Sequence, residues 1–114
     1  QKMIAATSRD TVRSRSRTGK PSRQLRSDWT KAWDGPDSPD VLPMPLQSLL
    51  GEPVMRRIDA LAEQGNPGAQ ELATYWVGQG VGLMNKATTV REVIYEMAQD
   101  FAEAAEHLAG VLDD

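Results

Sequence analysis

The sequence contains no cysteine and a single histidine, and aromatic residues make up only 5% of its 114 residues. The absence of cysteine excludes disulfide frameworks, zinc knuckles, iron–sulfur ligation and thiol catalysis, and it favours a cytoplasmic protein. The low aromatic content leaves an all-β sandwich or barrel little to build with. No apolar run approaches the length of about eighteen residues that a transmembrane helix needs, so we expect no membrane partner.

The length limits the chain to one domain, or to a piece of one. It begins with Gln1 rather than Met and shows no signal peptide. We therefore expect processing, proteolysis or a fragment of a longer protein.

Charge is divided unevenly along the chain. Residues 1–35, the basic arm, hold nine of the thirteen Lys and Arg residues but only three of the sixteen acids. Such an arm is typical of proteins that contact nucleic acid or another anion, and equally of two halves that face each other or a third segment. Because Asp10, Asp28 and Asp34 interrupt the arm and the sequence pI is about 5.1, we expect no nucleic-acid partner.

The first half of the chain predicts little regular structure. Residues 2–7 are typical of the end of a helix, and residues 11–17 alternate as a short edge strand does, before a turn at 19–21. Trp29 and Trp33 stand four residues apart and favour a packing face over nucleotide stacking. Residues 34–53 carry five of the seven prolines and predict a long ordered connector.

The second half is predicted to be helical. A helix is expected to start at Pro53, which suits a first helical position, and to end at the Gly-Asn-Pro-Gly turn of residues 65–68. A shorter helix is expected over residues 69–76.

The final helix is the strongest element. Thr89 and Glu92 form a capping-box signature at its start, and acidic residues follow one face. The opposite face is an apolar stripe, which predicts a helix packed along one side against another part of the protein. The apolar stripe consists of Val90, Val93, Ile94, Met97, Phe101, Ala104, Ala105, Leu108 and Leu112.

No catalytic residue and no metal site are predicted within these residues. His107 follows Glu103 by four positions on an acidic helix face, which indicates a surface Glu–His pair. Zinc proteases need two histidines on one helix face, and no Gly-x-Ser-x-Gly nucleophile motif is present.

The glycine-rich run of residues 78–82 allows two interpretations. It is neither a dinucleotide-binding fingerprint nor a phosphate loop. Its alternating glycines either permit tight helix packing, with Gln79 capping a backbone group, or let the backbone approach a flat ligand.

Three sequence runs, in this order and spacing, resemble the flavin-dependent nitronate monooxygenases, formerly called 2-nitropropane dioxygenases. The first begins RDTVRSR at Arg9 and continues through TGKP to Arg26, the second is PMPLQSLL at residues 43–50, and the third is WVGQGVGL at residues 76–83. The resemblance covers essentially the whole chain.

The resemblance implies a mainly α segment with at most a short strand, forming the C-terminal part of a (β/α)₈ barrel. Residues 1–75 would supply the end of a barrel helix, the basic arm, the proline-rich connector and a helical lid subdomain. Residues 76–114 would supply a glycine-rich active-site turn and the final barrel helix. Because such barrels need about 250 residues, the N-terminal barrel portion would come from another chain or fragment.

The resemblance also implies an FMN cofactor, bound mainly outside this chain, and a nitronate-like substrate oxidised with O₂. It places Gly78, Gln79 and Gly80 at the cofactor and Tyr75 and Trp76 in the substrate pocket. The family's catalytic histidine has no counterpart here, so this chain alone would be inactive. Two alternatives remain open: an enoyl reductase of the same flavin barrel fold, and a non-catalytic interaction module with a basic docking arm.

Overall fold

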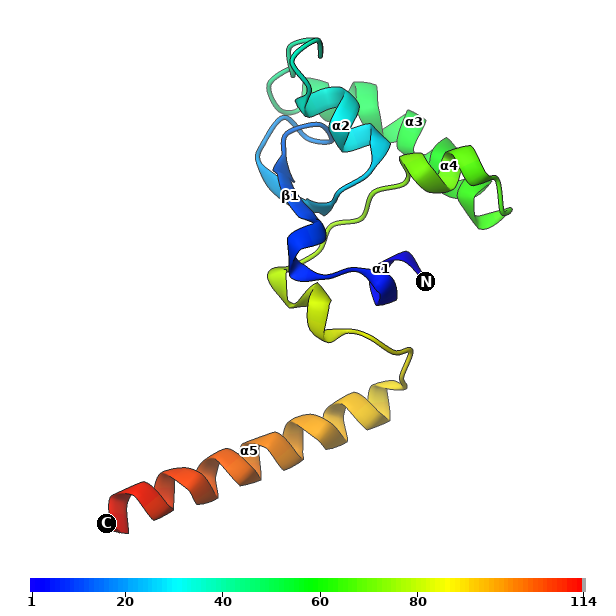
Figure 1. Cartoon of the computed structure of the whole chain (residues 1–114). Coiled ribbons are helices and arrows are strands. Elements are labelled where there is room, and N and C mark those ends of the chain that lie inside the picture. The colour runs from blue at the N-terminus through cyan, green and yellow to red at the C-terminus, as the bar shows by residue number, and fades with distance from the viewer. Residues whose placement is uncertain (114) are drawn as a thin grey trace.

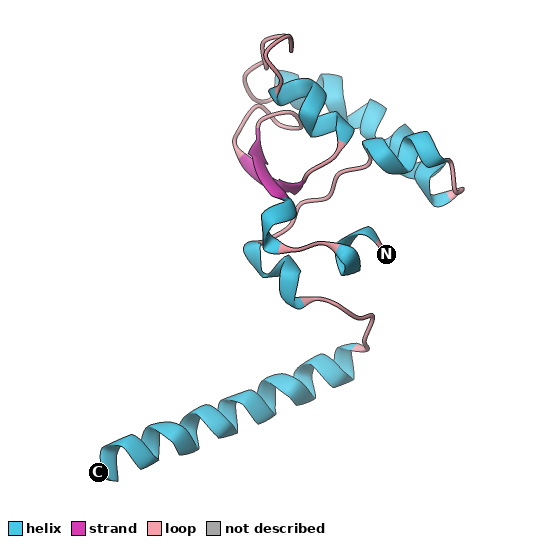
Figure 2. Cartoon of the chain, in the orientation of Figure 1, coloured by secondary structure: helices cyan, strands magenta, loops and turns pink. Residues whose placement is uncertain are grey.

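A computed structural model describes residues 1–113 of the chain, and it is mostly helical (Figures 1 and 2). A small folded body contains residues 1–83, and one long helix extends away from it. In chain order the elements are α1 (Lys2–Ala5), η1 (Ser8–Asp10), β1 (Thr11–Ser14), β2 (Ser22–Leu25), α2 (Asp28–Asp34), α3 (Leu46–Glu63), α4 (Pro67–Leu72), η2 (Gln79–Leu83) and α5 (Val90–Asp113), where η marks a 3-10 helix.

The basic arm forms two strands, where the sequence predicted at most one. β1 and β2 pair antiparallel, with Thr11 opposite Leu25 and Ser14 opposite Ser22. The predicted turn between them is confirmed at Gly19, whose φ of 83° suits glycine. The second strand was missed because its sequence, SRQL, shows little apolar alternation. The backbone groups of β2 pair with two neighbours, β1 and the later segment around Trp76.

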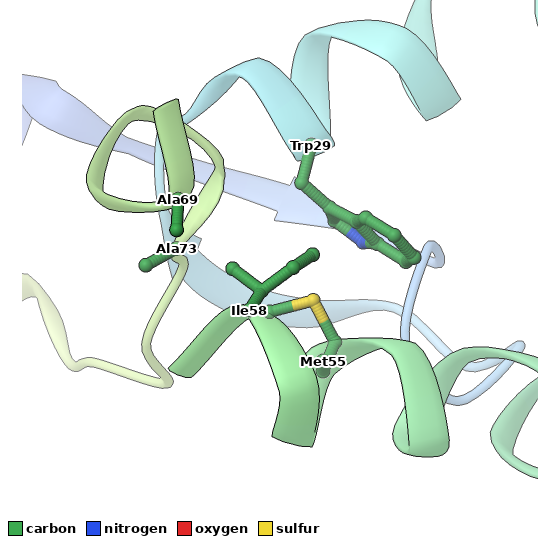
Figure 3. Packing of buried hydrophobic residues seen from close by; sticks show 5 residues of the cluster. All are labelled: Trp29, Met55, Ile58, Ala69 and Ala73. Atoms are coloured by element: carbon green, nitrogen blue, oxygen red, sulfur yellow. The ribbon is translucent and has the colours of Figure 1, made fainter. Parts of the chain in front are cut away.

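The apolar core is small and lies between α2, α3 and α4 (Figure 3). It consists of Trp29, Met55, Ile58, Ala69 and Ala73. Trp33 packs against this cluster, with its ring centre 5.8 Å from that of Trp29, which confirms the packing face predicted for the two tryptophans.

Helix α3 starts at Leu46, so the prediction of a start at Pro53 is wrong. Pro53 lies inside the helix on its exposed face, where water can reach the carbonyl group that the proline leaves free. The earlier start is stabilised by Gln47, which is fully buried. Its amide donates to the Ser16 carbonyl at 2.7 Å and accepts from the Leu42 N–H at 3.1 Å.

Helix α4 is shorter than the predicted range of residues 69–76. It starts two residues earlier, at Pro67, where the Asn66 side chain accepts a hydrogen bond from the Ala69 N–H. It ends at Leu72, because the following residues are extended and bond to β2 instead. Trp76 therefore lies outside the helix.

Helix α5 begins with the predicted capping box. The Thr89 N–H donates to the Glu92 carboxylate at 2.7 Å, and the Glu92 N–H donates back to the Thr89 hydroxyl at 3.3 Å. Hydrogen bonds from the Thr89 backbone and from the Thr88 and Thr89 hydroxyls lower the pKa of Glu92 from 4.5 to about 2.

The apolar stripe of α5 is almost entirely exposed. Phe101 is 77% exposed, Leu108 61% and Leu112 77%. The helix stands clear of the folded body, and the radius of gyration is 18.9 Å, against about 13 Å for a compact domain of this length (Figure 1). No other part of the described chain covers this stripe.

Candidate functional site

Residues 74–77, which include the predicted substrate-pocket residues Tyr75 and Trp76, pair with β2. The Leu25 N–H donates to the Tyr75 carbonyl at 2.9 Å, and the Val77 N–H donates to the Arg23 carbonyl at 3.2 Å. The Thr74 hydroxyl adds a bond to the Leu25 carbonyl at 2.6 Å. This pairing fixes the backbone on both sides of Trp76 before the glycine-rich run begins.

Trp76 lies on the face of this segment that meets the basic arm. The guanidinium carbon of Arg17 sits 3.9 Å from the centre of the Trp76 ring, and the indole N–H donates to the Ser22 hydroxyl at 3.3 Å. The side chain is nevertheless 52% exposed. Trp76 is thus fixed against the arm while a large part of its ring is free to contact another group.

Tyr75 has different surroundings. Its half-buried ring packs against the apolar core, and it lines a cavity of about 470 Å³ together with Lys2 and Gln70. The Lys2 ammonium donates to the Gln70 and Ala73 carbonyls at the end of α4, and its burial lowers its pKa. Tyr75 and Trp76 therefore contact different parts of the folded body, although they are adjacent in sequence.

The glycines of the run do not share one role. A Cβ atom placed on Gly82 would lie 2.9 Å from the Ser8 backbone nitrogen, so Gly82 allows η2 to pack closely on η1. A Cβ atom on Gly80 would meet no heavy atom within 4 Å, and one on Gly78 only the Gly80 nitrogen at 3.9 Å. Close packing within the described chain thus accounts for Gly82 but not for Gly78 or Gly80.

This difference predicts opposite outcomes for two matched substitutions. Gly82→Ala is expected to destabilise the folded body by about 1–3 kcal/mol, because rigid backbone cannot yield to the added methyl group. Gly80→Ala should change the free energy of unfolding by less than about 0.5 kcal/mol. Urea unfolding followed by Trp fluorescence measures both. Equal losses from the two substitutions would contradict the separation of roles.

Gln79 is exposed at the start of η2. Among the hydrogen bonds of residues 1–113, none involves its side-chain amide, so the prediction that it caps a backbone group finds no such partner here. Both N–H donors of the amide and its carbonyl acceptor are therefore available to a group outside the described chain.

The three runs that carry the family resemblance meet in space. Gln47 of the second run clamps the Ser16 carbonyl of the first. A Cβ atom on Gly19 would lie 2.4 Å from the Leu42 carbonyl, so the turn of the first run also packs against the connector. Trp76 of the third run lies under Arg17 of the first. Together the runs form the support of the candidate site.

Sequence reasoning missed the pair formed by Arg17 and Glu52. The buried Arg17 guanidinium donates to both carboxylate oxygens of Glu52, at 2.9 and 3.0 Å from Nη2. Thirty-five positions separate the two residues, and nothing in the sequence distinguishes Arg17 from the other arginines of the arm. Only the fold reveals the pair.

Residues 1–113 contain no group of three His, Asp or Glu side chains close enough to hold a metal ion. Within the same part of the chain, none of the helices is long and apolar enough to cross a membrane. His107 lies on the exposed surface of α5, far along the chain from the candidate site.

Comparison with known proteins connects these features to one relative. No protein-family model and no solved structure matches the chain. It is 50% identical over 111 residues to a Mycobacterium tuberculosis protein named "Putative monooxygenase Rv1533". The similarity covers 97% of this chain. This chain therefore corresponds to about 30% of the relative's length.

Proposed function

We propose that this chain is the C-terminal part of an FMN-dependent monooxygenase that oxidises nitronate-like substrates with O₂. The observation that carries the proposal is the 50% identity, over nearly the whole chain, to a protein named as a monooxygenase. The three runs that resemble nitronate monooxygenases support the narrower assignment, since they join to build one local structure. Below, the complete enzyme means this chain together with the proposed barrel portion.

The residues present fit a flat cofactor. Gly78 and Gly80 leave open space where side chains would stand, and the Gln79 amide is free to pair with a ring carbonyl or nitrogen. These three residues would contact the edge of the flavin ring, while the phosphate would be held by the barrel portion. FMN, when bound, supplies the electron-accepting chemistry.

The residues of this chain would bind the flavin ring and shield the substrate from water, and they would not transfer protons. Gln79 would hold a polar atom of the ring, and Trp76 would form an apolar wall that excludes water from the substrate. Tyr75 faces a separate cavity, which it shares with Lys2. Its proposed place in the substrate pocket requires that this cavity and the exposed face of Trp76 open into one pocket in the complete enzyme. The proton-accepting histidine expected from the family would come from the barrel portion, because His107 lies on α5.

The exposed stripe of α5 favours a large apolar partner. Val90, Ile94, Met97 and Phe101 follow the spacing of a coiled-coil seam, but Leu112 lies beside the seam and widens the stripe. Ala104 and Leu108 continue the seam, whereas Val93 and Ala105 lie beside it and widen the stripe further. A stripe of this width is typical of a helix packed on a globular core. We propose that the barrel portion of the same enzyme covers it.

Turnover assays on the complete enzyme separate the two flavin-dependent alternatives. We expect O₂ consumption with an alkyl nitronate, and no oxidation of a reduced nicotinamide driven by an enoyl thioester. The reverse pattern would assign the chain to an enoyl reductase. A colourless protein with neither activity would favour the interaction module instead.

The interaction module has less support from the structure. The basic arm uses several of its cations internally: Arg17 pairs with Glu52, the Arg23 guanidinium donates to the Thr11 hydroxyl at 2.8 Å, and Arg15 donates to the Gly19 carbonyl at 2.9 Å. These contacts favour a structural role for the arm over docking onto an acidic partner.

A further inference from the structure

Trp76 combines a fixed ring with a large exposed surface. One face is covered by Arg17, its N–H is bonded to Ser22, and its backbone forms a bridge to Gln24. Even so, the residue is 52% exposed. Because Arg17 occupies one face, the exposed half of the ring comprises mainly its other face and its rim.

Arg17 is itself held in place. It is only 6% exposed, and its Nε and Nη2 atoms donate to Glu52 in a forked arrangement at 2.9–3.1 Å. The neighbouring Ser16 carbonyl is clamped by Gln47. The carboxylate of Glu52 balances the charge of Arg17, so the guanidinium supports the indole with its flat face and does not create a site for an anion.

An aromatic ring that is fixed before binding loses little conformational entropy when a ligand contacts it. Aromatic groups pair best in offset stacks or edge to face, and these geometries require a ring that holds its orientation. A Trp side chain with one supported face and one open face meets this requirement. The exposed aromatic ring of Phe101 on α5 has no comparable support within the described chain.

We propose that Arg17 is a positioning residue that holds Trp76 as a stacking platform for a planar, conjugated group of the substrate. The inference rests on the proposed function in placing Trp76 at the substrate pocket. It adds a substrate class: nitro compounds that carry a flat ring are preferred over saturated nitro compounds of the same size.

Nitrobenzene and nitrocyclohexane form a pair of binding probes, because they share the nitro group and ring size but only the first is flat. Only nitrocyclohexane has a C–H next to the nitro group and can form a nitronate, so binding is measured without O₂ to prevent its turnover. The complete enzyme is labelled with fluorotryptophan, and the Trp76 fluorine resonance is assigned by its loss in Trp76→Phe. We expect nitrobenzene to shift this resonance and to bind at least about three-fold more tightly than nitrocyclohexane. Equal affinity for the two probes, or no shift at Trp76, would overturn the proposal.

The role of Arg17 is tested with two variants and one control. Arg17→Met should weaken nitrobenzene binding about two- to ten-fold and broaden the Trp76 resonance, with nitrocyclohexane binding unchanged. Arg17→Lys keeps the positive charge but loses the flat guanidinium group. If Arg17→Met does not fold, Arg17→Lys is used to test whether the flat group is needed to hold Trp76. Arg57→Met, on the exposed face of α3, should change neither affinity. A loss of stability with an unchanged preference for the flat probe would show that Arg17 is merely structural.

The flavin absorbance of the same samples keeps the two proposals apart. If the protein contains no flavin but still binds nitrobenzene more tightly, the proposed FMN cofactor is refuted and the proposed stacking role of Trp76 is retained. A flavin-containing protein that binds both probes equally refutes the platform and retains the proposed function.

Discussion

Phe101→Ala is expected to destabilise the complete enzyme by about 3–5 kcal/mol, the usual loss when a buried phenylalanine is removed from a core. In the isolated chain the same substitution should change stability by less than about 0.5 kcal/mol, because Phe101 is already 77% exposed there. The contrast follows directly from the proposal that the barrel portion covers the apolar stripe of α5. Urea unfolding of both proteins, with and without the substitution, measures it.

Glu103→Ala serves as the matched control, since Glu103 lies on the acidic face of the same helix. It should leave the stability of both proteins nearly unchanged. The isolated chain should also show weak amide-exchange protection in α5, or associate through the stripe. If Phe101→Ala costs the complete enzyme no stability and α5 of the isolated monomer is well protected from amide exchange, the stripe has no such partner.

Gln79→Ala is expected to shift the flavin spectrum of the complete enzyme and to lose about 1–3 kcal/mol of cofactor binding or transition-state stabilisation. The reason is that removing the amide leaves a polar atom of the ring without its partner. Global stability should change little, because Gln79 is exposed in the folded body. Flavin titration, the visible spectrum and the melting temperature together provide the measurement.

The control for Gln79→Ala is Gln99→Ala, which removes the same group from the exposed surface of α5. It should leave spectrum, affinity and turnover unaltered. A lower melting temperature for Gln79→Ala with unchanged flavin absorbance and turnover would show that the residue has a purely structural role.

The sequence predicted those structural features that depend only on residues close together in the chain. The capping box at Thr89 and Glu92, the turn at Gly19 and the break at Gly65 all depend on neighbouring residues, and each is confirmed. The start of α3 could not be predicted in this way. It depends on Gln47 reaching the basic arm thirty-one positions earlier, which offsets the cost of a proline inside the helix.

At the candidate site, too, local features could be predicted from the sequence, whereas contacts between distant residues could not. The alternating glycines indicated a close approach of the backbone to another surface, but the sequence could not separate Gly82, which faces Ser8, from Gly80, which faces open space. Trp76 was singled out, whereas its support by Arg17 and Glu52 arises from tertiary packing of residues far apart in the chain. Contacts over such separations carry no local pattern.

The most direct test of the central claim is a native mass spectrum of the protein purified from its own host. Our account predicts a species considerably heavier than 12.5 kDa, in which this sequence is joined to or associated with the barrel portion and which carries FMN. A colourless 12.5 kDa monomer with no bound flavin would contradict it.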